Sequence, residues 1–187
     1  DRGVNLSQYD WEDDPVVLAQ RDDVDVYVEL MGGSDGPAKA SIEAALAAGK
    51  DVVTENKALL AHHGQEQAER AEASGRVIRY EAAVAGGIPV IKALKEGLVA
   101  NKIVSIMGIM NGTANYILTR MTDEGVPFDK GLKDAQALGF AEADPTYDIE
   151  GIDTAHKLAI LMMMSYGMKI SLDDISVEGI TRIEPVD

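Results

Sequence analysis

Acidic and basic side chains gather in one short stretch of the chain. Asp148, Asp153 and Lys157 follow one another closely, and Glu142 lies just before them. Asp153 and Lys157 are four positions apart, so on a helix they share one face. A lysine held beside carboxylates can donate or accept a proton. The spacing therefore predicts an acid–base site, although the Asp153/Lys157 pair alone is also typical of a surface ion pair.

A turn and a helix must position these groups. The turn contains Gly139-Phe140-Ala141-Glu142-Ala143-Asp144-Pro145, and a helix is predicted over residues 150–166. A loop that presents acids at the start of a helix is a common arrangement in functional sites. The residues after Lys157 are apolar, so we expect this helix to be largely buried.

The first part of the chain alternates strand and helix patterns. Strands are predicted over 24–30, 51–54 and 77–80, and helices over 37–48 and 64–74. Strands that alternate with helices at this spacing indicate βαβ units and a parallel sheet. We therefore predict an α/β domain over residues 1–80.

The pattern changes at Glu81. A small-residue hinge over 81–89 leads into a second domain, predicted to be α+β, over residues 81–187. Its predicted helices cover 90–100, 113–122, 129–138 and 150–166, and its predicted strands cover 103–110 and 174–180.

Four other segments could contribute to a site. Lys57 follows the 51–54 strand at its carboxyl end, where ligands bind in open α/β sheets, but a solvated loop lysine would look the same. Gly32 ends the previous strand and could admit a cofactor close to the backbone, or simply make a turn. The segment 111–115 could bind a small polar ligand or cap a helix. The irregular segment 84–88 could offer carbonyls to a hard cation or act as a plain hinge.

Composition excludes several classes of protein. The chain has 187 residues, a formal net charge of -15, no cysteine and 46% hydrophobic residues. The acidic balance argues against nucleic acid as a partner, and the lack of cysteine excludes disulfides and thiolate metal sites. No apolar run is long enough for a membrane span, and no signal peptide is recognisable. We expect a cytoplasmic protein with a real hydrophobic core.

The motifs together resemble the homoserine dehydrogenase family over essentially the whole chain. The most diagnostic stretch runs from Ala135 through Gly139, Asp144-Pro145 and Asp148 to Gly151-x-Asp153-x-x-x-Lys157. The blocks that begin at Val28, Val53, Glu81 and Asn111 are similar to other blocks of the family and occur in its order. The resemblance implies a Rossmann-like first domain that is only partial, because the expected strand and G-x-G-x-x-G loop do not occur. Either this is not a Rossmann protein or the chain is a central portion that starts after that loop; we expect the second.

The resemblance also implies an activity. The family reduces L-aspartate 4-semialdehyde to L-homoserine, reversibly, with NADPH or NADH, on the route to threonine, methionine and isoleucine. A homodimer of the complete protein is implied as well.

Residue roles follow from the resemblance motif by motif. Lys157 is implied as the proton donor to the developing alkoxide, with Asp153 orienting it or binding substrate, and Lys57 lies between substrate and nicotinamide. The implied substrate contacts are Glu142, Asp148, Gly112 and Thr113. The implied cofactor contacts are Met31, Gly32 and Lys57. A sodium-type cation is implied at Glu81, Val84, Gly86 and Ile88, largely through carbonyl oxygens.

Two other interpretations stay open. The chain could be a catalytically incompetent product of the same fold that only binds substrate or a partner chain. It could also belong to a different semialdehyde or amino-acid dehydrogenase that shares the two-domain plan.

Overall fold

The chain forms two compact units in the computed structural model, which describes residues 3–184 and 186–187. The first unit ends at Tyr80 and the second begins at Glu81. Among the described residues, no helix is both long and apolar enough to cross a bilayer.

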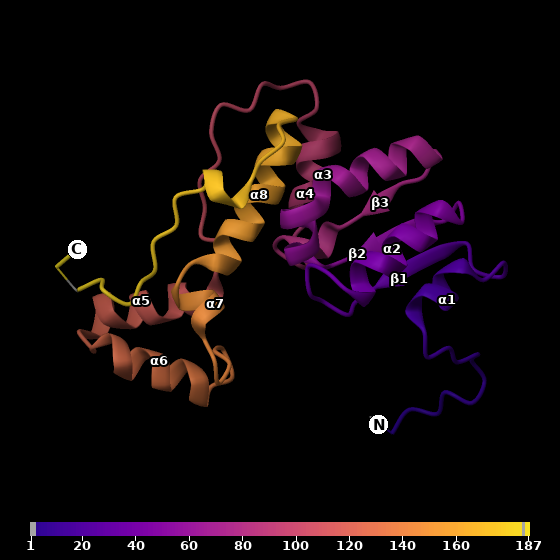
Figure 1. The fold of residues 1–187 in the computed structure, drawn as a ribbon. Coiled ribbons are helices and arrows are strands. Elements are labelled where there is room, and N and C mark those ends of the chain that lie inside the picture. The colour runs from indigo at the N-terminus through magenta and orange to yellow at the C-terminus, as the bar shows by residue number, and fades with distance from the viewer. Residues whose placement is uncertain (1–2, 185) are drawn as a thin grey trace. The chain divides into compact units, whose positions relative to one another are not determined.

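A three-stranded parallel sheet is the centre of the first unit. Its order is β1-β2-β3, with Val26 opposite Asp51 and Val52 opposite Ile78. The strands are β1 (Val26–Glu29), β2 (Asp51–Thr54) and β3 (Ile78–Arg79), and the helices are α1 (Pro15–Gln20), α2 (Pro37–Ala47) and α3 (Lys57–Ser74). The α/β prediction with parallel strands is confirmed, and α2 and α3 lie along the sheet (Figure 1).

The alternation of side chains along β1 explains how this unit packs. Tyr27 and Glu29 point inward and are buried, whereas Val26 and Val28 are exposed on the other face. Tyr27 joins Ile42 of α2 and other residues in one apolar core. The inward position of Glu29, a carboxylate, is the exception to the apolar pattern.

Helices make up the regular structure of the second unit in the part of the chain that the structure describes. They are α4 (Val90–Lys92), α5 (Gly112–Glu124), α6 (Phe128–Ala137), α7 (Thr146–Ile149) and α8 (Ile152–Tyr166), with short 3₁₀ turns η1 (Glu81–Ala83) and η3 (Leu172–Asp174) and a π-type turn η2 (Ala93–Gly97). Helices α5 and α6 lie side by side, and Ile117, Met121 and Ala135 form their core (Figure 1). At Gly131 a side chain would meet Ile117 Cγ2 at 3.2 Å, so this glycine permits the close approach of the two helices.

Two predicted strands are wrong for the described residues. Residues 103–110 are irregular and pair with no other strand, and Val104, Met107 and Ile109 are each at least 80% exposed. Residues 174–180 begin in η3 and continue irregularly, attached to α7 by one backbone hydrogen bond from Ile180 to Ile149 (2.8 Å). The sequence pattern shows β-type side chains, but a strand also needs a partner with which to share backbone hydrogen bonds.

Two helices differ most from their predicted bounds. Helix α3 begins at Lys57 rather than at Gly64, because the Asn56 side chain accepts a hydrogen bond from the Leu59 N–H (3.0 Å) and caps the helix. The helix predicted over 90–100 is the short α4 followed by the wider η2 turn.

Candidate active site

Lys157 is the centre of a hydrogen-bonded network in the second unit. Its Nζ donates to Asp153 Oδ2 at 2.6 Å and to the carbonyl of Met110 at 2.8 Å. The lysine and the aspartate face each other because they are four positions apart on α8, as their spacing predicts. Asp153 is buried, while the Lys157 side chain is 19% exposed. This is a partly buried ion pair with access to solvent, not a free surface contact.

Asn111 joins the two aspartates of the site. Its Nδ2 donates to Asp148 Oδ1 at 2.7 Å and to Asp153 Oδ2 at 3.0 Å. Its Oδ1 accepts from the N–H of Ala114 at 2.8 Å, which makes Asn111 the N-cap of α5. One buried side chain therefore fixes the start of a helix and the geometry of two carboxylates. For segment 111–115 the structure shows the helix cap at Asn111, and the contact with a small polar ligand stays a prediction.

Within the described residues, Lys157 has two hydrogen-bond acceptors and so keeps one donor for a ligand. An ammonium carries three N–H bonds, and two of those of Lys157 are accounted for by Asp153 and Met110. Both partners are acceptors, so the third N–H can turn to a ligand oxygen. The network is thus suited to hold an ammonium beside a group that gains negative charge.

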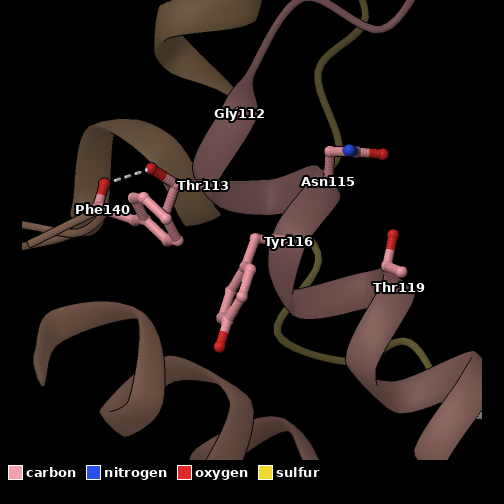
Figure 2. Close-up of a pocket in the computed structure, with 6 residues that line it drawn as sticks. All are labelled: Gly112, Thr113, Asn115, Tyr116, Thr119 and Phe140. Carbon is pink, nitrogen blue, oxygen red and sulfur yellow. Dashed lines mark hydrogen bonds between the residues drawn. The ribbon is translucent and has the colours of Figure 1, made fainter. Parts of the chain in front are cut away.

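Gly112 and Thr113 begin α5 and border a pocket of about 490 Å³. The Thr113 hydroxyl donates to the carbonyl of Phe140 at 2.7 Å, as Figure 2 shows. The rings of Phe140 and Tyr116 meet edge to face with centroids 5.1 Å apart. The lining residues are Gly112, Thr113, Asn115, Tyr116, Thr119 and Phe140. The structure therefore gives Thr113 a role in holding the turn before α7; its predicted substrate contact stays a prediction.

Asp148 and Glu142 lie in different surroundings. Asp148 lies on α7 and borders a second pocket of about 280 Å³. Glu142 is exposed, and within the described residues only its carbonyl has a hydrogen bond, at 3.0 Å from Gln136 Nε2. The turn itself is firm, since the N–H and hydroxyl of Thr146 both donate to Asp144 and lower the pKa of that carboxyl. Asp148 joins the network through Asn111, whereas no contact among the described residues brings Glu142 to it.

The predicted cofactor residues of the first unit lie at the carboxyl ends of β1 and β2. Met31 and Gly32 follow β1, and Gly32 has φ +78°, a conformation that favours glycine. A Cβ added at Gly32 would meet nothing within 4 Å, so the backbone there is open to a ligand. Lys57 is half-buried at the first position of α3.

The predicted cation segment has an unusual backbone. Ala85 has φ +52°, the one non-glycine residue with positive φ among the described residues, and Gly87 has φ +87°. The Glu81 carboxylate accepts from the N–H groups of Ile91 (3.0 Å) and Lys92 (2.9 Å), so it caps α4. No cluster of three or more acidic, histidine or cysteine side chains that could hold a metal occurs in the described part of the chain. A cation here would therefore depend on backbone carbonyls, as predicted.

The comparisons with known proteins agree with these motifs. The sequence model of the homoserine dehydrogenase family matches residues 89–187, and that of the family's NAD-binding domain matches residues 3–81. The chain belongs to the homoserine dehydrogenase family. The expected membership is thereby confirmed, and the first unit is related to an NAD-binding domain.

Three relatives show the extent of the similarity. The homoserine dehydrogenase of Neisseria gonorrhoeae is 51% identical over 174 residues, which cover 93% of this chain and 40% of that protein. A crystal structure of a homoserine dehydrogenase from Thiobacillus denitrificans superposes with a TM-score of 0.89 at 50% identity, covering 92% of this chain and 40% of that one. A structure of a hyperthermophilic archaeal homoserine dehydrogenase in complex with NADPH superposes with a TM-score of 0.83 at 30% identity, covering 96% of this chain and 54% of that one. The chain thus spans about two fifths of the curated relatives it matches.

Proposed function

We propose that the protein is the site-bearing part of a homoserine dehydrogenase, which interconverts L-aspartate 4-semialdehyde and L-homoserine with NADPH or NADH. The observation that carries this proposal is the ammonium of Lys157, held by Asp153 and Met110 with one donor left over. Membership of the family supplies the substrate class, and the first unit's relation to an NAD-binding domain supplies the cofactor class.

The residues fit the chemistry of an aldehyde reduction. A reduced nicotinamide, when bound, supplies a hydride to the aldehyde carbon. Negative charge then develops on the aldehyde oxygen, and the third N–H of Lys157 stabilises that oxygen and protonates it. Asp153 and Asn111 keep the ammonium and the neighbouring carboxylates in place. In the reverse direction Lys157 accepts the proton from the alcohol.

Asp148 is the group we assign to the substrate ammonium. Its Oδ1 accepts from Asn111, which leaves Oδ2 for a positively charged amino group. Gly112 and Thr113, at the start of α5, would contact the rest of the substrate. We propose that Glu142, which is exposed on the turn before α7, supplies a second carboxylate to the same amino group.

The cofactor fits the carboxyl ends of the parallel strands. Ligands of open α/β sheets bind at that edge, and the open backbone at Gly32 allows a flat ring to approach. Met31, Gly32 and Lys57 would contact the nicotinamide half of the cofactor.

We also propose that the protein forms a homodimer and lies in the cytoplasm. Light scattering of the complete gene product would test the dimer, and fractionation of the cell would test the location.

A monovalent cation fits the segment that includes Val84 and Gly86. Within the described residues, neither carbonyl accepts a backbone hydrogen bond; Val84 is buried, so its carbonyl lacks the partner that a buried carbonyl normally has, whereas Gly86 is exposed. Ile88 also offers a carbonyl, which accepts from Val90 (2.8 Å) but keeps a second lone pair. We propose that Glu81, Val84, Gly86 and Ile88 hold a sodium-type ion through carbonyl oxygens. Thermal melts in sodium against tetramethylammonium chloride would test it; equal melting temperatures would refute it.

The decisive experiment concerns Lys157. In the complete gene product, NADPH oxidation with aspartate semialdehyde should be measured for the wild type and for Lys157→Ala. Loss of a positioned proton donor lowers turnover by about 10²–10⁴-fold, with a much smaller change in KM. Lys169→Ala, an exposed lysine of the same unit, is the matched control and should keep full activity.

Two outcomes would contradict the proposal. Wild-type protein that oxidises NADPH with other aldehydes but not with aspartate semialdehyde would show a different dehydrogenase. Near-normal turnover of Lys157→Ala would eliminate Lys157 as the proton donor.

A further inference from the structure

Glu29 is a carboxylate in the core of the first unit. It is 1% exposed, on the same face of β1 as Tyr27. Buried acids are rare in apolar strands because removing the charge from water is unfavourable unless hydrogen bonds compensate. The surroundings of Glu29 therefore indicate what it is for.

Three hydrogen bonds reach the two oxygens of this carboxylate. The N–H groups of Met31 (2.6 Å) and Gly32 (3.1 Å) donate to Oε1, and the hydroxyl of Thr54 (2.7 Å) donates to Oε2. Glu29 thus binds the loop after β1 on one side and the end of β2 on the other. Thr54 is itself 1% exposed, so the link lies wholly inside the unit.

The connection continues from Thr54 back to the same loop. The Thr54 hydroxyl accepts from the N–H of Asn56 (2.9 Å), and Asn56 Nδ2 donates to the carbonyl of Gly33 (2.7 Å). A closed ring of hydrogen bonds therefore runs from Glu29 through Thr54 and Asn56 to the 31–33 loop. Asn56 also caps α3, at whose first position Lys57 lies. The ring fixes the loop and the lysine relative to each other.

The ring also determines which backbone groups of the loop can bind a ligand. The N–H groups of Met31 and Gly32 are directed inward to Glu29, so they are not available to bind a phosphate. The carbonyls of Met31 and Gly32 accept no hydrogen bond within the described part of the chain. The loop therefore offers carbonyl acceptors, and its N–H groups are bound to the buried carboxylate of Glu29. Such a surface favours ligand groups that donate hydrogen bonds, such as an amide or sugar hydroxyls, and disfavours phosphates.

We propose that Glu29 is a positioning residue that sets the 31–33 loop to receive the carboxamide and ribose hydroxyls of the nicotinamide half of the cofactor. This inference rests on the proposed dehydrogenase function and extends it, because it adds a buried residue that determines which hydrogen-bonding groups the loop presents to the nicotinamide half. Glu29 touches no substrate; it acts through Met31 and Gly32.

The test compares two ligands by calorimetry on the complete gene product. NADPH contains the nicotinamide nucleoside, and adenosine 2′,5′-bisphosphate lacks it. Glu29→Gln keeps the shape of the side chain but replaces one acceptor by a donor. It should weaken NADPH binding about tenfold, the effect of one unsatisfied buried group, and change bisphosphate binding less than twofold.

Thr54 and Gln67 supply the second variant and the controls. Thr54→Val removes the hydroxyl and should reproduce the selective loss, whereas Thr54→Ser keeps the hydroxyl and should bind NADPH as the wild type does. Gln67→Met alters a residue of α3 that is also fully buried but binds Glu43 instead of the loop, and it should leave the ratio of the two affinities unchanged.

The outcomes separate the inference from the function on which it rests. Equal weakening of both ligands by Glu29→Gln and Thr54→Val, or no weakening by either, would overturn the inference while leaving the dehydrogenase assignment in place. A wild-type protein that binds neither of these ligands nor NADH would overturn both. If Glu29→Gln does not fold, the pair Thr54→Val and Thr54→Ser still decides the question.

Discussion

Asn111 should prove to be the most sensitive non-catalytic residue of the second unit. It caps α5 through Ala114 and donates to two carboxylates, so two substitutions can separate these roles. Asn111→Ala removes both. Asn111→Ser keeps a hydroxyl that can cap the helix but removes the amide donors.

The magnitudes follow from the contacts. Loss of an N-cap costs about 1 kcal/mol. Each hydrogen bond to a charged group contributes about 1.5 kcal/mol or more, but Asp153 keeps Lys157 and Asp148 is only partly buried, so about 2 kcal/mol is expected for the pair. We expect Asn111→Ala to lower the free energy of unfolding by about 3 kcal/mol and Asn111→Ser by about 2 kcal/mol.

Urea unfolding and amide hydrogen exchange together provide the assay. The N–H of Ala114 should lose its protection in Asn111→Ala and keep most of it in Asn111→Ser, because only the second retains a cap. Asn101→Ala, an exposed asparagine of the same unit, should be within about 0.5 kcal/mol of the wild type. A serine variant as stable as the wild type would refute the reasoning, since the bridge to the aspartates would then contribute nothing.

Two further predictions concern backbone packing and pH. Gly179→Ala should destabilise by about 2 kcal/mol in thermal melts, because its Cβ would come within 2.8 Å of the Ile149 carbonyl, whereas Gly108→Ala, with open space around it, should be nearly neutral. The hydrogen bond from Arg21 lowers the pKa of Asp23 to about 2, so this pair stabilises the fold above pH 4 and its contribution is lost as the pH falls from 4 toward 2. In Arg21→Gln the Asp23 carboxyl should titrate near its ordinary pKa of 3.8 by NMR; an unchanged midpoint would exclude Arg21 as the cause.

The elements that local patterns specify were predictable from the sequence. β2 was predicted with its observed bounds, since β-branched residues end at a turn signal. The Asp153/Lys157 contact was also predictable, because helical spacing alone brings the two side chains together. In both cases the information lies within a few residues of chain.

Contacts that span long stretches of sequence were not predictable in the same way. The bridge from Asn111 to Asp153 joins residues 42 positions apart, and the lysine's second acceptor is a backbone carbonyl, which no side-chain pattern reveals. The strand predicted over 103–110 is wrong for the opposite reason: its side chains suit a sheet, but no other strand in the described residues pairs with it. A clue did exist for Glu29, an acid at an inward-facing position of an apolar strand.

The two units use asparagine in the same way at their sites. Asn56 and Asn111 each cap a helix through Oδ1, and each uses Nδ2 to hold a different segment: the carbonyl of Gly33 for Asn56 and the two aspartates for Asn111. Aspartate or serine would cap either helix, but neither can donate from the position that Nδ2 occupies. The requirement for asparagine at these two junctions therefore comes from the segment that is held and not from the helix. Since Lys57 directly follows Asn56, and Gly112 directly follows Asn111, the same side chains that begin the helices also set the geometry of the groups proposed to meet cofactor and substrate.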